Sequence, residues 1–319
     1  MAKTWTLVIA IAFSTISLGS CSLSQLATRA VADSLTSGDA STFTSDDDPQ
    51  LIADALPFAL KLYQTLLEKE PNHRGLITAT GSGFIMYANA FVQTPAMMLP
   101  SDQFSRAEQM KVRAKKLYLR GRDILLNGMD RLHPGFLKAL NDDQYDLAFK
   151  GMTARDVPIL YWAAAGWFGA WSLDAFDFGL GLSVKRAGAM MHKALELAPD
   201  YGNGAIHEFY ILYYGALPPG MGGSEQKARE QFKEAVRVSQ GKLASPYVSL
   251  ATAVSIKTQN LKEFEELMKQ ALAINPDDVP ATRLMNIISQ EQARWYMDHL
   301  DQFFVSASDS VESDNATNP

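Results

Sequence analysis

Apolar residues recur at intervals of three and four along most of the chain, which is the period of a helix with one buried face. No segment shows the alternation of apolar and polar residues that marks a half-buried strand. The sequence therefore predicts an all-α fold.

Four of the expected helices share a further spacing, in which three contact residues stand at positions i, i+4 and i+7 and a helix breaker follows. The four sets are Ala59, Tyr63, Leu66 and Pro71; Ala187, Met191, Ala194 and Pro199; Ala228, Phe232, Ala235 and Gly241; and Phe264, Met268, Ala271 and Pro276. This spacing is typical of the second helix of a tetratricopeptide-type hairpin. We therefore expect an irregular array of helical hairpins with cryptic tetratricopeptide-like repeats.

Two segments, residues 75–93 and 157–173, contain no charged residue at all. A helix that is apolar on every side is a buried helix, so we expect the second segment to be the central helix of the bundle. Its Trp162 and Trp167 are candidates for lining an apolar passage. The alternative is that these rings pack in the core, as aromatic residues at helical spacing more often do.

Residues 190–223 predict the end of one helix, a tight joint, a second helix over about 204–215 and a Gly/Pro loop. At 100° per residue, one stripe of this second helix carries four candidate ligand- or pore-lining residues. They are Asn203, His207, Tyr210 and Tyr214. Such a stripe would suit a passage in which polar groups orient a carboxylate and rings cover an apolar body. The alternative is that these groups bond to other helices in the core.

Glu208 lies on the opposite side of the same helix. A buried carboxylate without a cation costs several kcal/mol, so we expect Glu208 to pair with an arginine such as Arg155 or Arg186.

The amino terminus has a positive residue, Lys3, an apolar core and then Leu18-Gly19-Ser20-Cys21. This pattern predicts an export signal over residues 1–20 and, because the motif resembles a lipobox, lipidation of Cys21. The alternative is an ordinary secretory signal with an incidental cysteine. Because Ser22 is not aspartate, we expect anchoring to the outer membrane on its periplasmic side.

The composition adds limits to this picture: 47% of residues are hydrophobic, 20% are charged and the net charge is −6. A chain of this kind can bury a large core, and it has no basic stripe for nucleic acid. We expect a lipidated tether over 21–45, an all-helical domain over 46–305 and a disordered, Ser/Asp/Asn-rich tail over 306–319.

The sequence offers no motif for catalysis, metal binding or a cofactor. The five histidines are scattered, and Gly202-Asn203-Gly204 follows a helix rather than the strand that a dinucleotide-binding turn requires. There is neither a phosphate-binding loop nor a nucleophile elbow. We therefore expect no metal, no cofactor and no enzymatic activity.

Four stretches together resemble one known family. They are the Leu-Gly-Ser-Cys motif, SDDDPQLIADALPFALKLYQTLL, GNGAIHEFYILYYGALPPGMGG and the closing ARWYMDHLDQFF. The chain is similar over about 46–304 to the TatT family, the periplasmic lipoproteins of tripartite ATP-independent periplasmic (TRAP) transporters. Residues 202–223 are the most specific part of the resemblance. The glycines of Gly179-Leu180-Gly181 depart from an ordinary helix start.

The resemblance implies hidden tetratricopeptide-like repeats, a homotrimer with a ligand-sized pore, and docking of a periplasmic solute-binding protein. It implies organic acids or other small, partly apolar ligands as the substrate class. The residues alone leave another function open, that of an outer-membrane-anchored scaffold whose repeats grip proteins of cell-envelope assembly.

Overall fold

The computed structural model describes residues 25–36 and 41–305. Residues 1–24, 37–40 and 306–319 lie outside the described part of the chain. The predicted export signal, the lipidation of Cys21 and the disordered tail therefore stay predictions.

The structure is built from helices, and its described residues contain no strand, which confirms the all-α prediction. The tetratricopeptide-like character of the repeats stays a prediction. The first group of helices is α2 (Ser41–Thr44), α3 (Pro49–Lys69), α4 (Arg74–Ala88), α5 (Thr94–Met97), α6 (Phe104–Leu132), α7 (Phe136–Asn141), α8 (Tyr145–Ala148), α9 (Val157–Leu173) and α10 (Phe178–Leu197). The second group is α11 (Ala205–Ala216), α12 (Glu225–Val238), α13 (Ser245–Leu250), α14 (Leu261–Ala273) and α15 (Arg283–Asp298).

Short helical turns connect or extend these helices. Those of 3₁₀ type are η2 (Ser101–Gln103), η3 (Ala154–Asp156), η4 (Tyr201–Gly204), η5 (Pro219–Met221), η7 (Pro276–Asp278), η8 (Pro280–Thr282) and η9 (Leu300–Gln302). Two are π-helical, η1 (Asn89–Gln93) and η6 (Ala251–Ser255).

The four helices that share the i, i+4, i+7 spacing are α3, α10, α12 and α14. Each of them ends two or three residues before the proline or glycine that the pattern places after it. Their starts are fixed by side-chain caps, since Asp48 accepts from the Leu51 amide at 3.0 Å and Asp177 accepts from the Leu180 amide at 3.0 Å. The Asp177 cap starts α10 in spite of the glycines that follow it.

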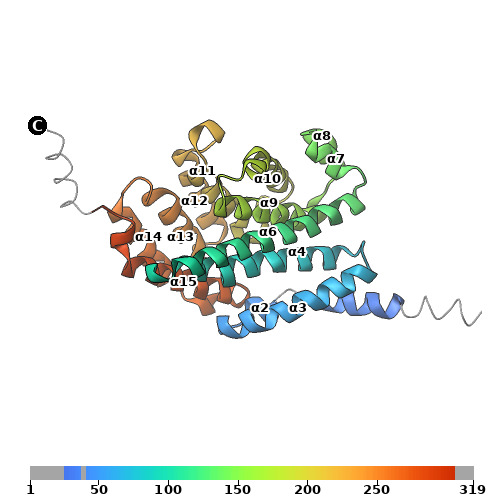
Figure 1. The fold of residues 1–319 in the computed structure, drawn as a ribbon, viewed down its shortest axis with the longest axis horizontal. Helices are drawn as coiled ribbons and strands as arrows, with labels where there is room; N and C mark the ends of the chain where they lie inside the picture. The colour runs from blue at the N-terminus through green and yellow to red at the C-terminus, as the bar shows by residue number, and fades with distance from the viewer. Residues whose placement is uncertain (1–24, 37–40, 306–319) are drawn as a thin grey trace, which may run out of the picture.

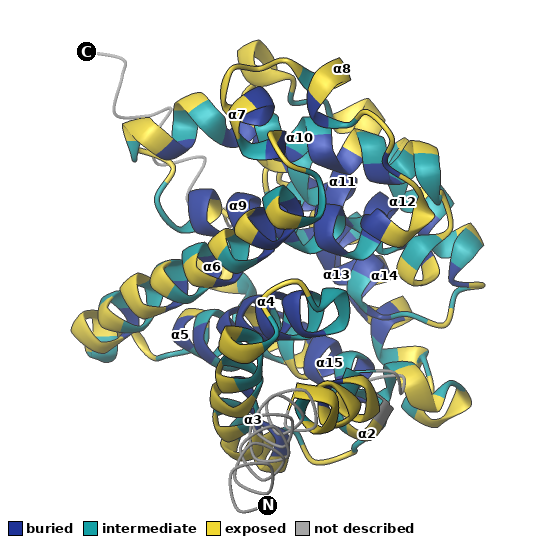
Figure 2. Ribbon diagram, turned by 90° about the vertical axis from the view of Figure 1, so that its right-hand side faces the viewer, coloured by how far each residue is buried: buried dark blue, intermediate teal, exposed yellow. Residues whose placement is uncertain are grey.

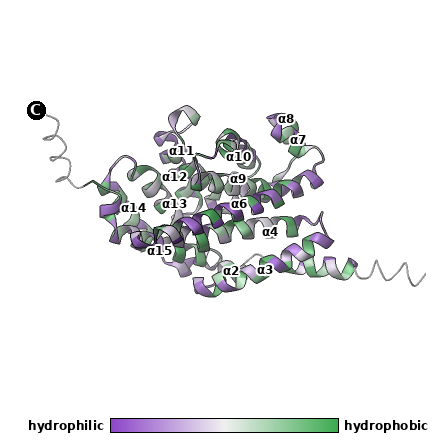
Figure 3. Cartoon of the chain, in the orientation of Figure 1, coloured by the Kyte–Doolittle hydropathy of each residue, from purple (hydrophilic) through white to green (hydrophobic). Residues whose placement is uncertain are grey.

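We call α3 to α10 the N-terminal lobe. Its core lies where α4, α6 and α9 pack against one another, with α10 on the other side of α9. Close approach of α4 to α6 depends on Gly121, because a Cβ there would stand 2.6 Å from the Gly81 carbonyl oxygen. Hydrophilic and hydrophobic residues recur along α6 (Figure 3). This is the pattern of a helix with one exposed face.

We call α12 to α15 the C-terminal lobe, which has a core of its own around Phe264, Met268 and Leu250. Helix α11 bridges the lobes: Ile206 and Phe209 belong to the first core, whereas Ile211 belongs to the second.

The lobes meet again on the side of α15, far from α11. Gln292 of α15 donates to the Thr94 hydroxyl at 2.7 Å, and Arg283 donates to the Ser45 carbonyl at 3.0 Å. The carboxyl-terminal helix thereby returns to α2 and α5 near the start of the fold (Figure 1). Two separate contacts hold the lobes together, one through α11 and one through α15.

Within the described part of the chain, the continuous helix from Arg74 to Met97 is long and apolar enough to cross a bilayer. In the fold, 56% of its most apolar stretch is buried inside the protein. Figure 2 shows α4 packed among other helices, which is the position of a core helix.

Candidate functional site

The joint between α10 and α11 is made by three consecutive residues with left-handed backbone angles. The φ values are +60° at Gly202, +54° at Asn203 and +95° at Gly204. Glycine adopts this region without steric cost, and at Gly204 a side chain would also approach the Ala235 carbonyl oxygen at 3.1 Å. Because α11 begins only at Ala205, Asn203 lies outside the helix and is exposed. The prediction that Asn203 shares a helical stripe with His207 is therefore wrong.

His207 is buried and joins α11 to α12. Its Nδ1 lies 2.7 Å from Oε1 of Gln231, so the imidazole donates from Nδ1 to that carbonyl oxygen. This contact satisfies the histidine inside the protein. It corresponds to the core alternative for this residue.

Tyr210 and Tyr214 belong to a stack of aromatic rings along α11. Their ring centroids lie 5.3 Å apart, and Phe209 and Phe168 continue the stack toward α9 at 5.6 Å and 5.3 Å. Tyr210 is buried, and this burial raises the pKa of its hydroxyl. Tyr214 is half-buried at the outer end, where the Lys227 ammonium lies 5.4 Å above its ring.

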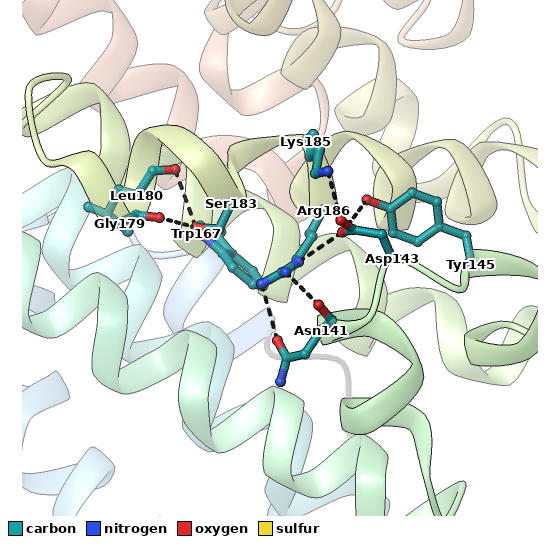
Figure 4. Close-up of polar contacts among 9 residues, drawn as sticks. All are labelled: Asn141, Asp143, Tyr145, Trp167, Gly179, Leu180, Ser183, Lys185 and Arg186. Atoms are coloured by element: carbon teal, nitrogen blue, oxygen red, sulfur yellow. Dashed lines mark hydrogen bonds and ion pairs between the residues drawn. The ribbon is translucent and has the colours of Figure 1, made fainter.

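Trp167 is held in the N-terminal lobe and faces away from this stack. Its indole N–H donates to the Ser183 hydroxyl at 3.1 Å, and that hydroxyl donates to the Gly179 carbonyl at 2.7 Å (Figure 4). The Arg122 guanidinium lies 4.8 Å from the ring centroid on the other side. With only 5% of its surface exposed, Trp167 packs α9 against α6 and α10.

Arg186 of α10 is held by the end of α7 and the residues that follow it (Figure 4). Its guanidinium donates to the Asn141 carbonyl at 2.6 Å and to the Asp143 carboxylate at 3.2 Å. Lys185 reaches the same carboxylate at 2.7 Å, and the two cations lower the pKa of Asp143 to about 2. These contacts fasten the α7–α8 segment to α10.

Glu208 has no cation among its described partners, so the prediction that it pairs with Arg155 or Arg186 is wrong. Arg186 is bound to the α7–α8 segment, and Arg155 lies exposed at the start of α9. The carboxylate instead accepts hydrogen bonds from two serine hydroxyls of α13, from Ser245 at 2.7 Å and from Ser249 at 3.1 Å. Burial raises the pKa of Glu208, and the two hydrogen bonds oppose this rise only in part.

One aromatic side chain of the N-terminal lobe, Tyr161, lies next to this carboxylate. Burial raises the pKa of Tyr161 on α9, and the negative charge of Glu208 raises it further, which reflects their proximity. The Tyr161 ring centroid lies 5.2 Å from Trp162 and 5.2 Å from Tyr201. We call Glu208, Ser245, Ser249, Tyr161, Trp162 and Tyr201 the Glu208 cluster.

The Glu208 cluster is formed by α9, η4, α11 and α13, at the junction of the lobes. Five of its six members keep accessible surface, Ser249 being the buried one. Of the candidates from the sequence, only Trp162 belongs to it. Glu208 was singled out from the sequence, but its serine partners were not, because Ser245 lies 37 residues away from it in the chain and α13 carries no local motif.

A hollow lies elsewhere on the protein, between α3 and α6. It encloses about 560 Å³ and is lined by basic residues that include Arg120 and Arg131. Both residues already have structural partners, since Arg120 lies 5.4 Å above the Phe84 ring and Arg131 donates to the Pro71 carbonyl at 2.9 Å. This hollow is open and shallow, and it lies on another face from the Glu208 cluster.

Within the described residues, no group of three or more His, Cys, Asp or Glu side chains could hold a metal ion. The Glu208 cluster presents one carboxyl group, two hydroxyl donors and three aromatic rings.

Comparison with known proteins identifies the family. A family model described as "TRAP transporter T-component" matches residues 45–304. The chain belongs to this family. A T-component is part of a transport system, and the family is not one of enzymes. This T-component is also 36% identical over 266 residues to an uncharacterized protein of Treponema pallidum (strain Nichols), and the similarity covers 82% of each chain.

Proposed function

We propose that this T-component is a periplasmic lipoprotein that docks the solute-binding protein of a TRAP-type transporter and binds or conducts a small ligand. The observation that carries the proposal is the family match, which spans almost the whole helical domain. A TRAP-associated accessory role follows from that match. Docking and ligand passage are the finer parts that need experiments.

The architecture supports a ligand path between the lobes. The lobes are joined through α11 on one side and through α15 on the other, and the Glu208 cluster lies at the first of these junctions. Rings that keep accessible surface beside a few polar groups are the usual lining of a small-molecule site. We place the ligand there.

The anchoring and assembly of the protein complete the proposal. Cys21 carries the lipid that holds the protein at the periplasmic face of the outer membrane, and three copies assemble into a homotrimer. A Cys21→Ser chain should lose lipid labelling and leave the membrane fraction. Full retention in the membrane would contradict the lipoprotein assignment.

Co-purification tests the docking role. The tagged full-length protein is extracted from its own cells in detergent, and proteins that elute with it are identified by mass spectrometry. A solute-binding protein of a TRAP system in the eluate is the expected result. Recovery of outer-membrane assembly proteins without it would favour the scaffold function and contradict the proposal.

A further inference from the structure

The missing countercharge at Glu208 is the starting point. Two other carboxylates with low exposure are paired with arginine: Asp156 with Arg74 at 2.7 Å, and Glu263 with Arg229, whose Nη2 lies 3.1 Å from Oε2. Glu263 also accepts from the Ser255 hydroxyl at 2.7 Å. Like Glu263, Glu208 accepts hydrogen bonds from serine hydroxyls, but it has no arginine partner.

An ionised carboxylate without a cation is unfavourable at such a position, because it has lost hydration. The two serine hydroxyls replace only part of that hydration. They would serve a glutamine side chain as well. Among the described residues no cation pairs with the carboxylate, which leaves a place for one positive charge beside Glu208.

The surroundings suit a positive charge of a particular kind. The faces of tyrosine and tryptophan rings attract cations, and an organic ammonium group gains from both a carboxylate and adjacent rings. The cluster supplies three such rings. The centroid of the Tyr161 ring lies 5.2 Å from that of Trp162 and 5.2 Å from that of Tyr201. These three residues and Glu208 each keep part of their surface accessible.

We propose that the Glu208 cluster binds the ammonium group of a small organic ligand, with the Glu208 carboxylate as its countercharge and the three rings around its apolar part. This inference rests on the proposed transport role, because it names the ligand class of the same path. It includes zwitterions, which carry a carboxylate elsewhere, and excludes simple organic anions. A carboxylate placed against Glu208 would be repelled.

Three probes of similar size and different charge test the proposal. Benzylamine is a cation, benzyl alcohol is neutral and benzoate is an anion. Titration calorimetry of the full-length protein should show benzylamine binding about tenfold or more tightly than the other two. Failure to bind benzylamine, or equal or tighter binding of benzoate, would overturn the proposal.

Matched variants locate the effect. Glu208→Gln should weaken benzylamine binding about tenfold, whereas Glu263→Gln removes a carboxylate with its own arginine and should leave binding unchanged. Trp162→Leu keeps the carboxylate and should weaken binding several-fold. If benzylamine binds Glu208→Gln as well as it binds the natural chain, the ligand does not use this carboxyl group and the proposal fails.

Proton release is a readout that a purely structural glutamate would not give. At a pH within the titration range of Glu208, a bound ammonium group should expel the proton that the raised pKa retains. The heat of binding should then differ between phosphate and MOPS buffers, neither of which carries a primary ammonium group, and the difference should vanish in Glu208→Gln. The other titratable groups of the cluster are Tyr161 of α9 and Tyr201 of η4, whose raised pKa values keep them neutral. His207 is turned to Gln231 of α12. Identical heats in both buffers at a pH where Glu208 is partly protonated would contradict the proposal.

These titrations use the isolated T-component. A failure to bind benzylamine would leave the docking role standing, and a failure of co-purification would leave the ammonium site standing.

Discussion

The carboxyl groups of Asp156 and Glu208 each join helices in this protein, and they differ in what stands opposite them. Asp156 is 2% exposed and lies where α4, α6 and α9 meet. It accepts from the Arg74 guanidinium at 2.7 Å, pairs with His133 Nε2 at 2.8 Å and accepts from the Thr153 amide at 2.8 Å. Glu208 joins α11 to α13 with two neutral hydroxyl donors only.

Burial acts on both groups in the same direction, yet their pKa values move in opposite directions. Burial is the largest single influence on Asp156 and would raise its pKa. The Thr153 amide, His133 and Arg74 together outweigh it, so the pKa falls. At Glu208 the serines do not outweigh burial, and the pKa rises. The charge and number of donors therefore distinguish a carboxylate that fastens helices from one that is available for a ligand.

The largest expected effect is at Asp156. Asp156→Ala leaves Arg74 and His133, which are both partly exposed, without their buried partner, so we expect a loss of about 2–3 kcal/mol in the free energy of unfolding. The measurement is urea denaturation at pH 7. Asp142→Ala, which removes an exposed partner of Lys138, is the control and should change stability little. A loss below about 1 kcal/mol for Asp156→Ala would contradict the claim that this carboxylate fastens helices.

The pH dependence of the natural protein follows from the lowered pKa of Asp156. A carboxyl group with a lowered folded-state pKa stabilises the fold above its unfolded value of about 4. That contribution is lost as the pH falls through the folded pKa. The stability difference between the natural chain and Asp156→Ala should therefore shrink below about pH 4. A difference that stays constant from pH 7 to pH 3 would contradict this assignment.

Glu263, like Glu208, accepts a hydrogen bond from a serine hydroxyl, but its pKa is lowered rather than raised. Replacing it should therefore change stability in the opposite direction. Glu263→Gln removes the charge that pairs with Arg229, and because the pair is partly exposed we expect a loss of only about 1–2 kcal/mol at pH 7. The pKa of Glu263 is lowered, first by its hydrogen bond from Arg229, so this loss should shrink in acid. Thermal unfolding at pH 7 and pH 4 measures it, and a stabilised Glu263→Gln at pH 7 would be the wrong sign.

Glu208→Gln should stabilise the protein at pH 8 by about 1 kcal/mol, since it removes an ionised group that burial disfavours. The sign of this stability change follows from the raised pKa of Glu208. As the pH rises above about 4, the unfolded chain loses its proton first, and the folded state becomes relatively less stable. Well below about pH 4 both states are protonated, and the substitution should have almost no effect. Destabilisation at pH 8 would show a hidden cation partner.

The smallest effects are expected on the stripe of α11. His207→Gln should cost about 1 kcal/mol, because it breaks the buried contact with Gln231. Tyr214→Phe should cost less than about 0.5 kcal/mol, because Tyr214 is half-buried at the end of the ring stack. Comparing the melting temperatures of the two variants is sufficient. Equal losses would indicate that the Tyr214 hydroxyl is bonded as firmly as the His207 ring.

The local sequence determines most helices, and it predicts them well. The charge-free segment 157–173 corresponds to α9, and the helices with the i, i+4, i+7 spacing end before their prolines or glycine. The joint between α10 and α11 was harder to predict, because three consecutive residues with left-handed backbone angles place Asn203 outside α11. Side-chain partners were harder still. Nothing local in the sequence says that Ser245 and Ser249, rather than an arginine, will reach Glu208.

The central claim is that Glu208 stands without a countercharge, and carboxyl carbon NMR tests it most directly. The full-length protein is labelled with ¹³C at the glutamate carboxyl carbons and titrated, with Glu208→Gln and Glu263→Gln spectra assigning the two signals. We predict that Glu208 titrates above the ordinary glutamate value of about 4 and Glu263 below it. A Glu208 signal that titrates at or below that value would contradict the account.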